Sequence, residues 1–248
     1  MRDIQALMKR FHNDPLGLLQ KLGGCYLRPP GGPLVGYAGT YDDEAGVPKN
    51  YVGELYANFA MAEQWPSVMD MWARYLCFKD ARAINDVNVF LGAPEGGKAL
   101  ADKLAMCNSR QYVYPDTKET PVIGGRPKKE FVWGCHKLEE GQKVAIVEDV
   151  ANNFSTTEKL IQLVLDAGCD PVVLICLLNR SPNVDDLFES SAVGAVRVVS
   201  LVRKPMPEYR QDDVYVADDI VNDNIVWKPR KTPEDWQRLM QAMAASSQ

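Results

Sequence analysis

The spacing of hydrophobic and polar positions predicts helices in the N-terminal part of the chain. Over residues 3–21 apolar side chains recur at helical spacing, and Pro15 divides the run into two short helices. Residues 23–39 are rich in Gly and Pro, which favours a loop or hairpin. From residue 51 to 77 the helical spacing returns and predicts two helices that meet near Pro66. We therefore expect helices on both sides of one irregular segment.

From residue 87 onward, short apolar runs alternate with helical patterns. The predicted strands cover residues 87–91, 144–147, 172–178 and 196–201. Helices are predicted over residues 98–106, 157–167 and 233–245, and Gly168 and Thr232 have the residue types of a C-terminal and an N-terminal cap. Strands that alternate with helices indicate an α/β fold with a doubly wound parallel sheet.

Composition narrows the class of protein. The 248 residues carry 28 Lys+Arg and 33 Asp+Glu, and the resulting net charge of −5 argues against nucleic acid as the main partner. Charged residues interrupt the apolar positions of residues 1–19, which is unlike a signal peptide, and the apolar runs are too short to span a membrane. We therefore expect a cytoplasmic protein. Pro and Gly are spread along the chain, which favours a single domain over residues 1–248.

Two loops follow predicted strands and contain residues suited to ligand binding. In an open parallel sheet, ligands bind at the carboxyl ends of the strands. After the strand at 87–91, Gly92-Ala93-Pro94-Glu95-Gly96-Gly97-Lys98-Ala99 has the Gly-x4-Gly-Lys spacing of a phosphate-binding P-loop. This pattern allows a nucleotide triphosphatase, but Ala99 stands where a P-loop has the Ser or Thr that binds Mg²⁺. A simple turn from strand to helix is the other interpretation of these glycines.

The second loop follows four apolar residues, 144–147, and two acids, Glu148 and Asp149. The segment Ala151-Asn-Asn-Phe-Ser-Thr-Thr157 then leads into the predicted helix. This arrangement resembles the phosphoribosyl diphosphate signature of the type I phosphoribosyltransferases. Two adjacent carboxylates can bind the 2- and 3-hydroxyls of a ribose, and a helix N-terminus offers N–H groups to its 5-phosphate.

Further segments resemble the orotate phosphoribosyltransferases within that family. Residues 24–39 resemble the segment that approaches the base, and residues 86–101 resemble the diphosphate-binding strand, turn and helix. Residues 125–130 resemble the start of the mobile catalytic loop, and residues 177–180 resemble the strand end whose Arg faces the base. The segments follow the family's chain order, and together they are more specific than any one of them, so the resemblance is preferred to a P-loop protein.

The resemblance implies an enzyme that transfers a phosphoribosyl group from phosphoribosyl diphosphate to a pyrimidine-like base, orotate or a related one, and releases diphosphate. It also implies a core at about residues 85–202, a hood from about residues 1–60 and possibly part of the tail, Mg²⁺ bound through the substrate, and a homodimer. The implied catalytic residues are Glu148, Asp149, Lys128 and Lys129. The implied 5-phosphate loop consists of Asn152, Asn153, Phe154, Ser155, Thr156 and Thr157. The implied diphosphate site consists of Gly92, Ala93, Pro94, Glu95, Gly96, Gly97, Lys98 and Arg126, and the implied base site of Arg28, Tyr37 and Arg180.

The phosphate loop departs from the family pattern. Asn152, Asn153 and Phe154 stand where the family has Thr-Thr-Gly, so a bulky aromatic replaces the Gly that lets a backbone approach phosphate closely. Two alternatives therefore stay open beside the active enzyme. One is a regulatory protein that binds a phosphoribosyl ligand or nucleotide without turnover, and the other is an enzyme of the same fold that acts on a different sugar phosphate.

Overall fold

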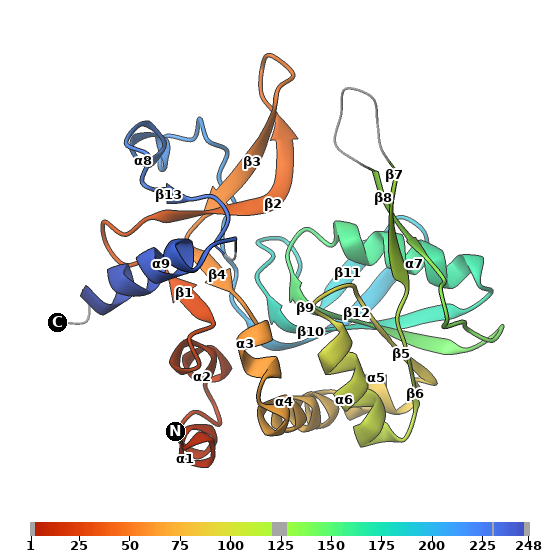
Figure 1. The fold of residues 1–248 in the computed structure, drawn as a ribbon. Coiled ribbons are helices and arrows are strands. Elements are labelled where there is room, and N and C mark those ends of the chain that lie inside the picture. Colours follow the sequence, from red (N-terminus) through yellow and green to blue (C-terminus); the bar gives the residue numbers. More distant parts are fainter. Residues whose placement is uncertain (1–2, 121–127, 230, 246–248) are drawn as a thin grey trace. The chain divides into compact units, whose positions relative to one another are not determined.

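The computed structural model describes residues 3–120, 128–229 and 231–245, which form two compact units (Figure 1). Residues 1–61 and 206–248 belong to the first unit, and residues 62–205 belong to the second. The short helix α3 (Ala60–Glu63) crosses this boundary. The single domain over residues 1–248 stays a prediction.

The second unit contains the predicted sheet. Its strands have the order β11-β12-β10-β9-β5-β6, and β11 is antiparallel to β12 whereas the remaining neighbours are parallel. The strands are β5 (Val89–Gly92), β6 (Gln111–Val113), β9 (Lys143–Ala151), β10 (Asp170–Asn179), β11 (Leu187–Ser190) and β12 (Gly194–Arg203). The prediction of an α/β fold with a mainly parallel sheet is confirmed.

Helices cover both faces of this sheet (Figure 1). The helix α7 (Ser155–Asp166) lies on one face, and α4 (Pro66–Lys79), α5 (Ala81–Asn85) and α6 (Lys98–Asn108) lie on the other. On the α7 face, Leu160, Ile161 and Val164 are buried against apolar side chains of the strands. The 3- and 4-residue spacing of these three residues is what makes α7 amphipathic, and it places one stripe of the helix on the sheet.

Strand β9 is longer than the predicted strand at residues 144–147. It continues through Glu148 and Asp149 to Ala151, because Val150 and Ala151 pair with Leu178 and Asn179 of β10. The predicted strand at 87–91 and the predicted helices at 98–106 and 157–167 are found within two residues of their expected ends.

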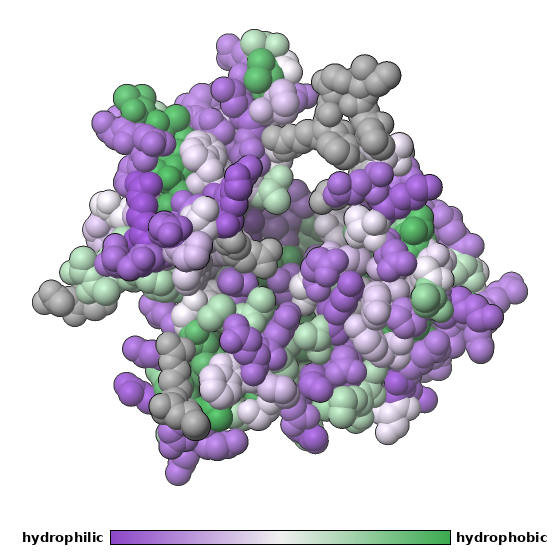
Figure 2. Space-filling view, in the orientation of Figure 1, coloured by the Kyte–Doolittle hydropathy of each residue, from purple (hydrophilic) through white to green (hydrophobic). Residues whose placement is uncertain are grey.

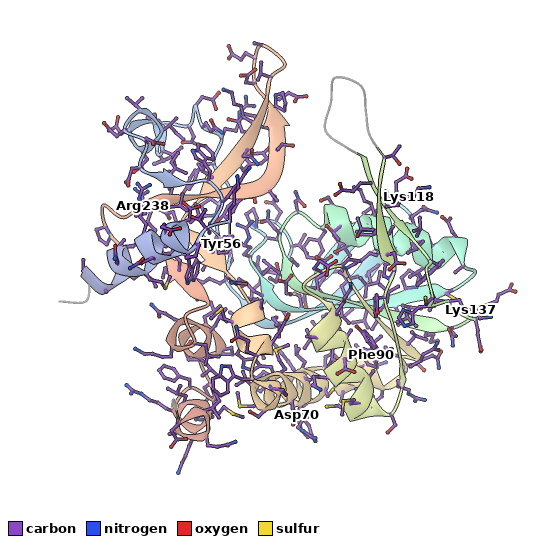
Figure 3. All side chains as sticks on the ribbon, in the orientation of Figure 1. Tyr56, Asp70, Phe90, Lys118, Lys137 and Arg238 are labelled. Carbon is purple, nitrogen blue, oxygen red and sulfur yellow. The ribbon has the colours of Figure 1, made fainter. Side chains whose placement is uncertain are left out.

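A two-stranded hairpin lies between β6 and β9. It consists of β7 (Asp116–Thr120) and β8 (Lys128–Val132), which pair antiparallel. All five residues of β7 are exposed, including Lys118 (Figure 3), whereas Phe131 of β8 packs against the apolar cluster under α7. The hairpin is therefore fixed to the unit at its base by one strand.

The first unit combines the N-terminal segment with the C-terminal tail. Its elements are α1 (Ile4–Arg10), α2 (Pro15–Lys21), β1 (Cys25–Leu27), β2 (Leu34–Asp42), β3 (Pro48–Gly53), β4 (Leu55–Ala57), α8 (Ala217–Val221), β13 (Ile225–Val226) and α9 (Pro233–Ala245). The helices predicted over residues 3–21 and 233–245 are confirmed. Of the two helices predicted over residues 51–77, the second is found as α4, which begins at Pro66. The prediction of a helix from residue 51 was wrong, since residues 51–53 belong to β3 and residues 55–57 to β4, which pair with β2 and β1.

The tail is held by strand pairing and by apolar contacts. β13 pairs parallel with β2, so that Ile225 is opposite Leu34 and Val226 opposite Val35. Leu239 of α9 is fully buried in a cluster with Tyr26 and Val35. The chain ends therefore fold together, although nearly 200 residues separate β2 from β13.

The face of the molecule shown in Figure 2 is mainly hydrophilic, with small groups of hydrophobic residues. One such group lies at α8, where Val214, Tyr215 and Val221 are exposed. Among residues 3–120, 128–229 and 231–245, every helix is too short or too polar to span a lipid bilayer.

Candidate functional site

The candidate site lies in the second unit, where β5 ends beside β9 and β9 continues through Glu148 and Asp149 to Ala151. The two strands are parallel, and Gly92 at the end of β5 is opposite Val147 of β9. Because parallel strands end at the same edge, the loops that follow them emerge together. Residues 93–97 lead into α6, and residues 152–154 lead into α7. The glycine turn after β5 therefore lies against the acidic end of β9, the strand from which the second predicted loop continues.

The glycine turn packs against the acidic end of β9. The N–H of Ala93 donates to the carbonyl of Val147 at 2.8 Å. A Cβ at Gly97 would overlap that same carbonyl oxygen, and a Cβ at Gly96 would overlap the carboxylate of Asp149. Both positions therefore require Gly for close approach. The turn, which includes a cis peptide bond between Pro94 and Glu95, is fitted to Asp149.

Lys98 is the first residue of α6 and lies beside this turn. Its Nζ is 3.4 Å from Oε2 of Glu95 and 4.5 Å from the ring centroid of Tyr114, a cation–π distance. The ring of His136 meets Tyr114 edge-on at 4.3 Å, and His136 Nδ1 is 3.1 Å from the Tyr114 carbonyl oxygen. These contacts place an ammonium group next to the predicted diphosphate site.

Glu148 and Asp149 point to opposite faces of the sheet, as successive residues of a strand must. Glu148 lies on the α7 face, where the Thr157 hydroxyl donates a hydrogen bond to its Oε1. Burial raises the pKa of Glu148 to about 7, the Thr157 hydrogen bond lowers it, and the neighbouring Asp149 charge raises it. Near neutral pH, Glu148 therefore changes between its ionised and neutral forms.

The surroundings of Glu148 on the α7 face are otherwise apolar. Cys176 of β10 is its register partner, and burial raises the pKa of that thiol, so the thiol stays neutral. A cavity of about 10 Å³, room for roughly one water molecule, lies between Glu148, Phe154, Cys176 and Val198. Little water can therefore reach the carboxyl group from this side.

Phe154 keeps the backbone conformation expected of Gly. Its φ of 57° lies in the left-handed region, and it stands immediately before α7. The side chain is 4% exposed and stacks on Phe188 of β11, with 4.8 Å between ring centroids and 15° between ring planes. The aromatic ring that replaces Gly in the phosphate loop is thus part of the core under α7.

The remaining loop residues present polar groups near the start of α7. Asn153 Oδ1 accepts from the N–H of Ser155 at 3.1 Å, and the N–H of Glu158 donates to the Phe154 carbonyl at 2.9 Å. Asn152 Oδ1 is buried and has no hydrogen-bond partner among the described residues. The first N–H groups of a helix have no partner within it, so this end of α7 can accept an anion.

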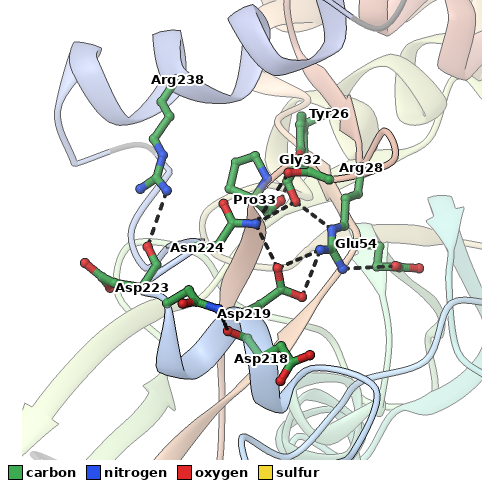
Figure 4. A network of polar contacts seen from close by, with 12 residues as sticks. Tyr26, Arg28, Gly32, Pro33, Glu54, Asp218, Asp219, Asp223, Asn224 and Arg238 are labelled. Atoms are coloured by element: carbon green, nitrogen blue, oxygen red, sulfur yellow. Dashed lines mark hydrogen bonds and ion pairs between the residues drawn. The ribbon is translucent and has the colours of Figure 1, made fainter.

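Arg28 (Figure 4) and Tyr37, both predicted to bind the base, belong to the first unit. The Arg28 guanidinium donates to both carboxylate oxygens of Asp219 at 2.8 Å and to the Gly32 carbonyl at 2.7 Å, and it lies 3.5 Å from Glu54. The Tyr37 hydroxyl donates to the carbonyl of Leu55 at 2.8 Å. No sequence pattern indicated Asp219 as a partner of Arg28.

Arg180, the third predicted base residue, lies in the second unit at the end of β10. Its N–H donates to the Ala151 carbonyl at 2.9 Å, and the residue is 8% exposed. Lys128 and Lys129 belong to β8, where they pair with Thr120 and Glu119, but their side chains lie outside the described structure. Arg126 lies outside the described residues.

The described side chains contain no protein-only metal centre. Across the described part of the chain, no three or more His, Cys, Asp and Glu side chains are grouped as they would be to hold a metal ion. Mg²⁺ commonly keeps several waters and is bound through one or two carboxylates together with substrate phosphates. The acids and the turn at the sheet edge are compatible with an ion that arrives with a phosphorylated substrate.

Comparisons with known proteins give a partial sequence match. No family model matches the chain. Residues of the chain are 34% identical over 83 positions to orotate phosphoribosyltransferase from two strains of Caulobacter vibrioides, NA1000 / CB15N and ATCC 19089 / CIP 103742 / CB 15. The match covers 34% of this chain and 39% of each relative, so it spans about two fifths of the relatives' length.

The solved structures to which this chain is similar include the following three proteins. Orotate phosphoribosyltransferase from Aeropyrum pernix has a TM-score of 0.49 at 19% identity, over 76% of this chain and 92% of that one. UMP synthase from Leishmania donovani has a TM-score of 0.48 at 13% identity, over 94% of this chain and 42% of that one. Adenine phosphoribosyltransferase from Thermoanaerobacter pseudethanolicus has 0.47 at 14% identity, over 61% and 89%. On its sequence match, the chain resembles the type I phosphoribosyltransferases, and the matched relatives are orotate enzymes.

Proposed function

We propose that this protein is a phosphoribosyltransferase that transfers a phosphoribosyl group from phosphoribosyl diphosphate to a pyrimidine-like base, orotate or a related one, and releases diphosphate. The contact between Gly96 and the Asp149 carboxylate carries the proposal. This close approach supports binding of diphosphate at the turn and of ribose at the acid pair, and the start of α7 follows the same strand and is proposed to bind the 5-phosphate.

Each part of the site has a physical role in this reaction. Asp149 and ionised Glu148 accept hydrogen bonds from ribose hydroxyls. The residue 92–97 turn and Lys98 bind diphosphate, and residues 152–156 bind the 5-phosphate with N–H and hydroxyl groups at the start of α7. As the bond to diphosphate breaks, positive charge develops on the ribose, and the two carboxylates stabilise that charge. Catalysis here consists of positioning and electrostatic stabilisation.

Mg²⁺ belongs to the proposal as an ion bound through the substrate. When bound, it neutralises charge on the diphosphate and favours its departure. Lys128, Lys129 and Arg126 are proposed to assist on the diphosphate side, and Arg28, Tyr37 and Arg180 to face the base. A homodimer is proposed from the family resemblance.

Phe154 favours a second candidate, in which the fold binds a different sugar phosphate or a nucleotide, with or without turnover. The loop keeps the left-handed backbone conformation at position 154 but gains a buried ring, and Asn152 contributes an acceptor without a partner among the described residues. A ligand with a hydrogen-bond donor at this point would satisfy that acceptor.

Calorimetric titration with phosphoribosyl diphosphate and Mg²⁺, followed by diphosphate release with a panel of bases, tests the proposal. We expect micromolar binding, and turnover that is lost in Glu148→Gln and Asp149→Asn while circular dichroism stays unchanged. Asp166→Asn, at the far end of α7, is the matched control and should retain turnover. Failure of the folded wild type to bind would refute the proposal, and binding of another sugar phosphate instead would favour the second candidate.

A further inference from the structure

Thr157 is the residue of the predicted phosphate loop that lies deepest in the protein. It is 2% exposed and belongs to the first turn of α7, on the side that faces the sheet. Its hydroxyl donates a hydrogen bond to Oε1 of Glu148. The sequence predicts that Thr157 binds phosphate, but this contact directs it toward the acid pair.

The chemistry of a hydroxyl limits what Thr157 can do. A Thr side chain has one O–H donor, and an anion such as phosphate needs donors. That single donor is already used by Glu148, in a place almost closed to solvent. While Glu148 is ionised, Thr157 can therefore contact phosphate through its side chain only by giving up the Glu148 carboxyl group.

We propose that Thr157 is a positioning residue, which holds the Glu148 carboxyl group in its ionised form for the ribose hydroxyls and does not bind the phosphate through its side chain. The proposal rests on the function proposed above only for the identity of the ligand. The contact with Glu148 does not depend on that ligand.

The groups around Glu148 explain why a donor is needed there. Asp149 on the same strand adds a like charge, and the Cys176 thiol on β10 stays neutral. Leu91 of β5 and Ala93, which follows that strand, are apolar and belong to the hydrophobic cluster that packs under α7. Burial and Asp149 both favour the neutral form of Glu148, whereas the Thr157 hydrogen bond favours the ionised form.

Removal of the Thr157 hydroxyl should therefore raise the pH at which Glu148 ionises. Thr157→Val keeps the shape of the side chain but has no donor. A hydrogen bond to a charged group contributes enough to shift the midpoint upward by about one to two pH units. Since wild-type Glu148 is about half ionised near pH 7, the ionised fraction in the variant should fall to about a tenth or less at that pH.

Carbon-13 NMR titration of the glutamate carboxyl groups in the unliganded protein measures this directly. Glu148→Gln identifies the resonance. We expect the pH midpoint of the Glu148 titration to move upward in Thr157→Val. It should stay at the wild-type value in Thr157→Ser and in the matched control Thr156→Val. If Thr157→Val does not fold, Thr157→Ala serves, because Ala also lacks the donor and favours helix. An unchanged midpoint in a folded variant without the hydroxyl would overturn the proposal.

Binding of phosphoribosyl diphosphate as a function of pH separates positioning from phosphate binding. For a positioning residue, Thr157→Val shifts the pH at which affinity rises, and affinity recovers at high pH. For a phosphate ligand, affinity falls by the same factor at every pH, and that result would overturn the proposal. If the wild type binds no phosphoribosyl diphosphate, the proposed function fails, and the NMR titration still decides the role of Thr157.

Discussion

Replacement of Phe154 by Gly tests whether the aromatic ring in the phosphate loop is part of the fold. The change restores the residue type that the related family has at this point. In the structure, the loop already has the left-handed conformation that Gly favours, with φ of 57°, and the ring is 4% exposed against Phe188. We therefore expect Phe154→Gly to destabilise the protein.

The magnitude follows from two opposing effects. Truncation of a buried Phe costs about 3–5 kcal/mol. Release of a non-Gly residue from the left-handed region returns about 1–2 kcal/mol, and the greater freedom of Gly in the unfolded chain costs about 0.5–1 kcal/mol. The free energy of unfolding should fall by about 2–4 kcal/mol in total.

Urea unfolding followed by circular dichroism measures this change, with Phe154→Ala as the matched control. Ala removes the ring but keeps the backbone strain, so Phe154→Gly should be more stable than Phe154→Ala by about 0.5–1 kcal/mol. A Phe154→Gly variant as stable as the wild type would refute the reasoning, because the ring would then contribute nothing through burial. A Gly variant less stable than the Ala variant would refute the strain argument alone.

Three further substitutions test other contacts. Burial raises the pKa of Glu148 from its ordinary 4.5 to about 7, so the contribution of this carboxyl group to the stability of the folded protein is complete below pH 4.5 and is lost as pH rises through 7. The stability of Glu148→Gln relative to wild type should therefore rise by about 3 kcal/mol between pH 4.5 and 8 in urea unfolding. Gly97→Ala should lose about 2 kcal/mol of stability, since its Cβ would overlap the carbonyl of Val147, and it should lose most of its affinity for diphosphate in calorimetry. Unchanged affinity would contradict the role of the turn. Asp219→Ala should cost about 2–3 kcal/mol in urea unfolding, because Arg28 would lose two hydrogen bonds, and a loss below about 0.5 kcal/mol would show that Glu54 and Gly32 hold Arg28 without it.

Local sequence patterns predicted strands β5, β9, β10 and β12 and helices α4, α6 and α7 of the second unit, whereas α5, β6, β7, β8 and β11 were not predicted. Short apolar runs are sufficient to predict these strands, and the stripe of Leu160, Ile161 and Val164 is sufficient to predict α7, because both depend on residues close in sequence. The order of strand, glycine turn and helix also predicted that the turn after β5 would lie beside the end of β9, since parallel strands end at one edge. The helix at 233–245 was predicted to the residue from Thr232, Pro233 and its apolar face.

Tertiary structure decided what depends on partners distant in sequence. Residues 51–57 have helical spacing but form strands, because β1 and β2 supply the pairing. Asp219 binds Arg28 from 191 positions away in sequence, and Phe154 stacks on Phe188 of β11. No spacing rule indicates either contact. The sequence by itself determined the local elements and the two loops at the sheet edge. The tertiary structure decided which side chains are occupied by structural contacts, because hydrogen bonds and burial are set by neighbours that the chain brings together only on folding.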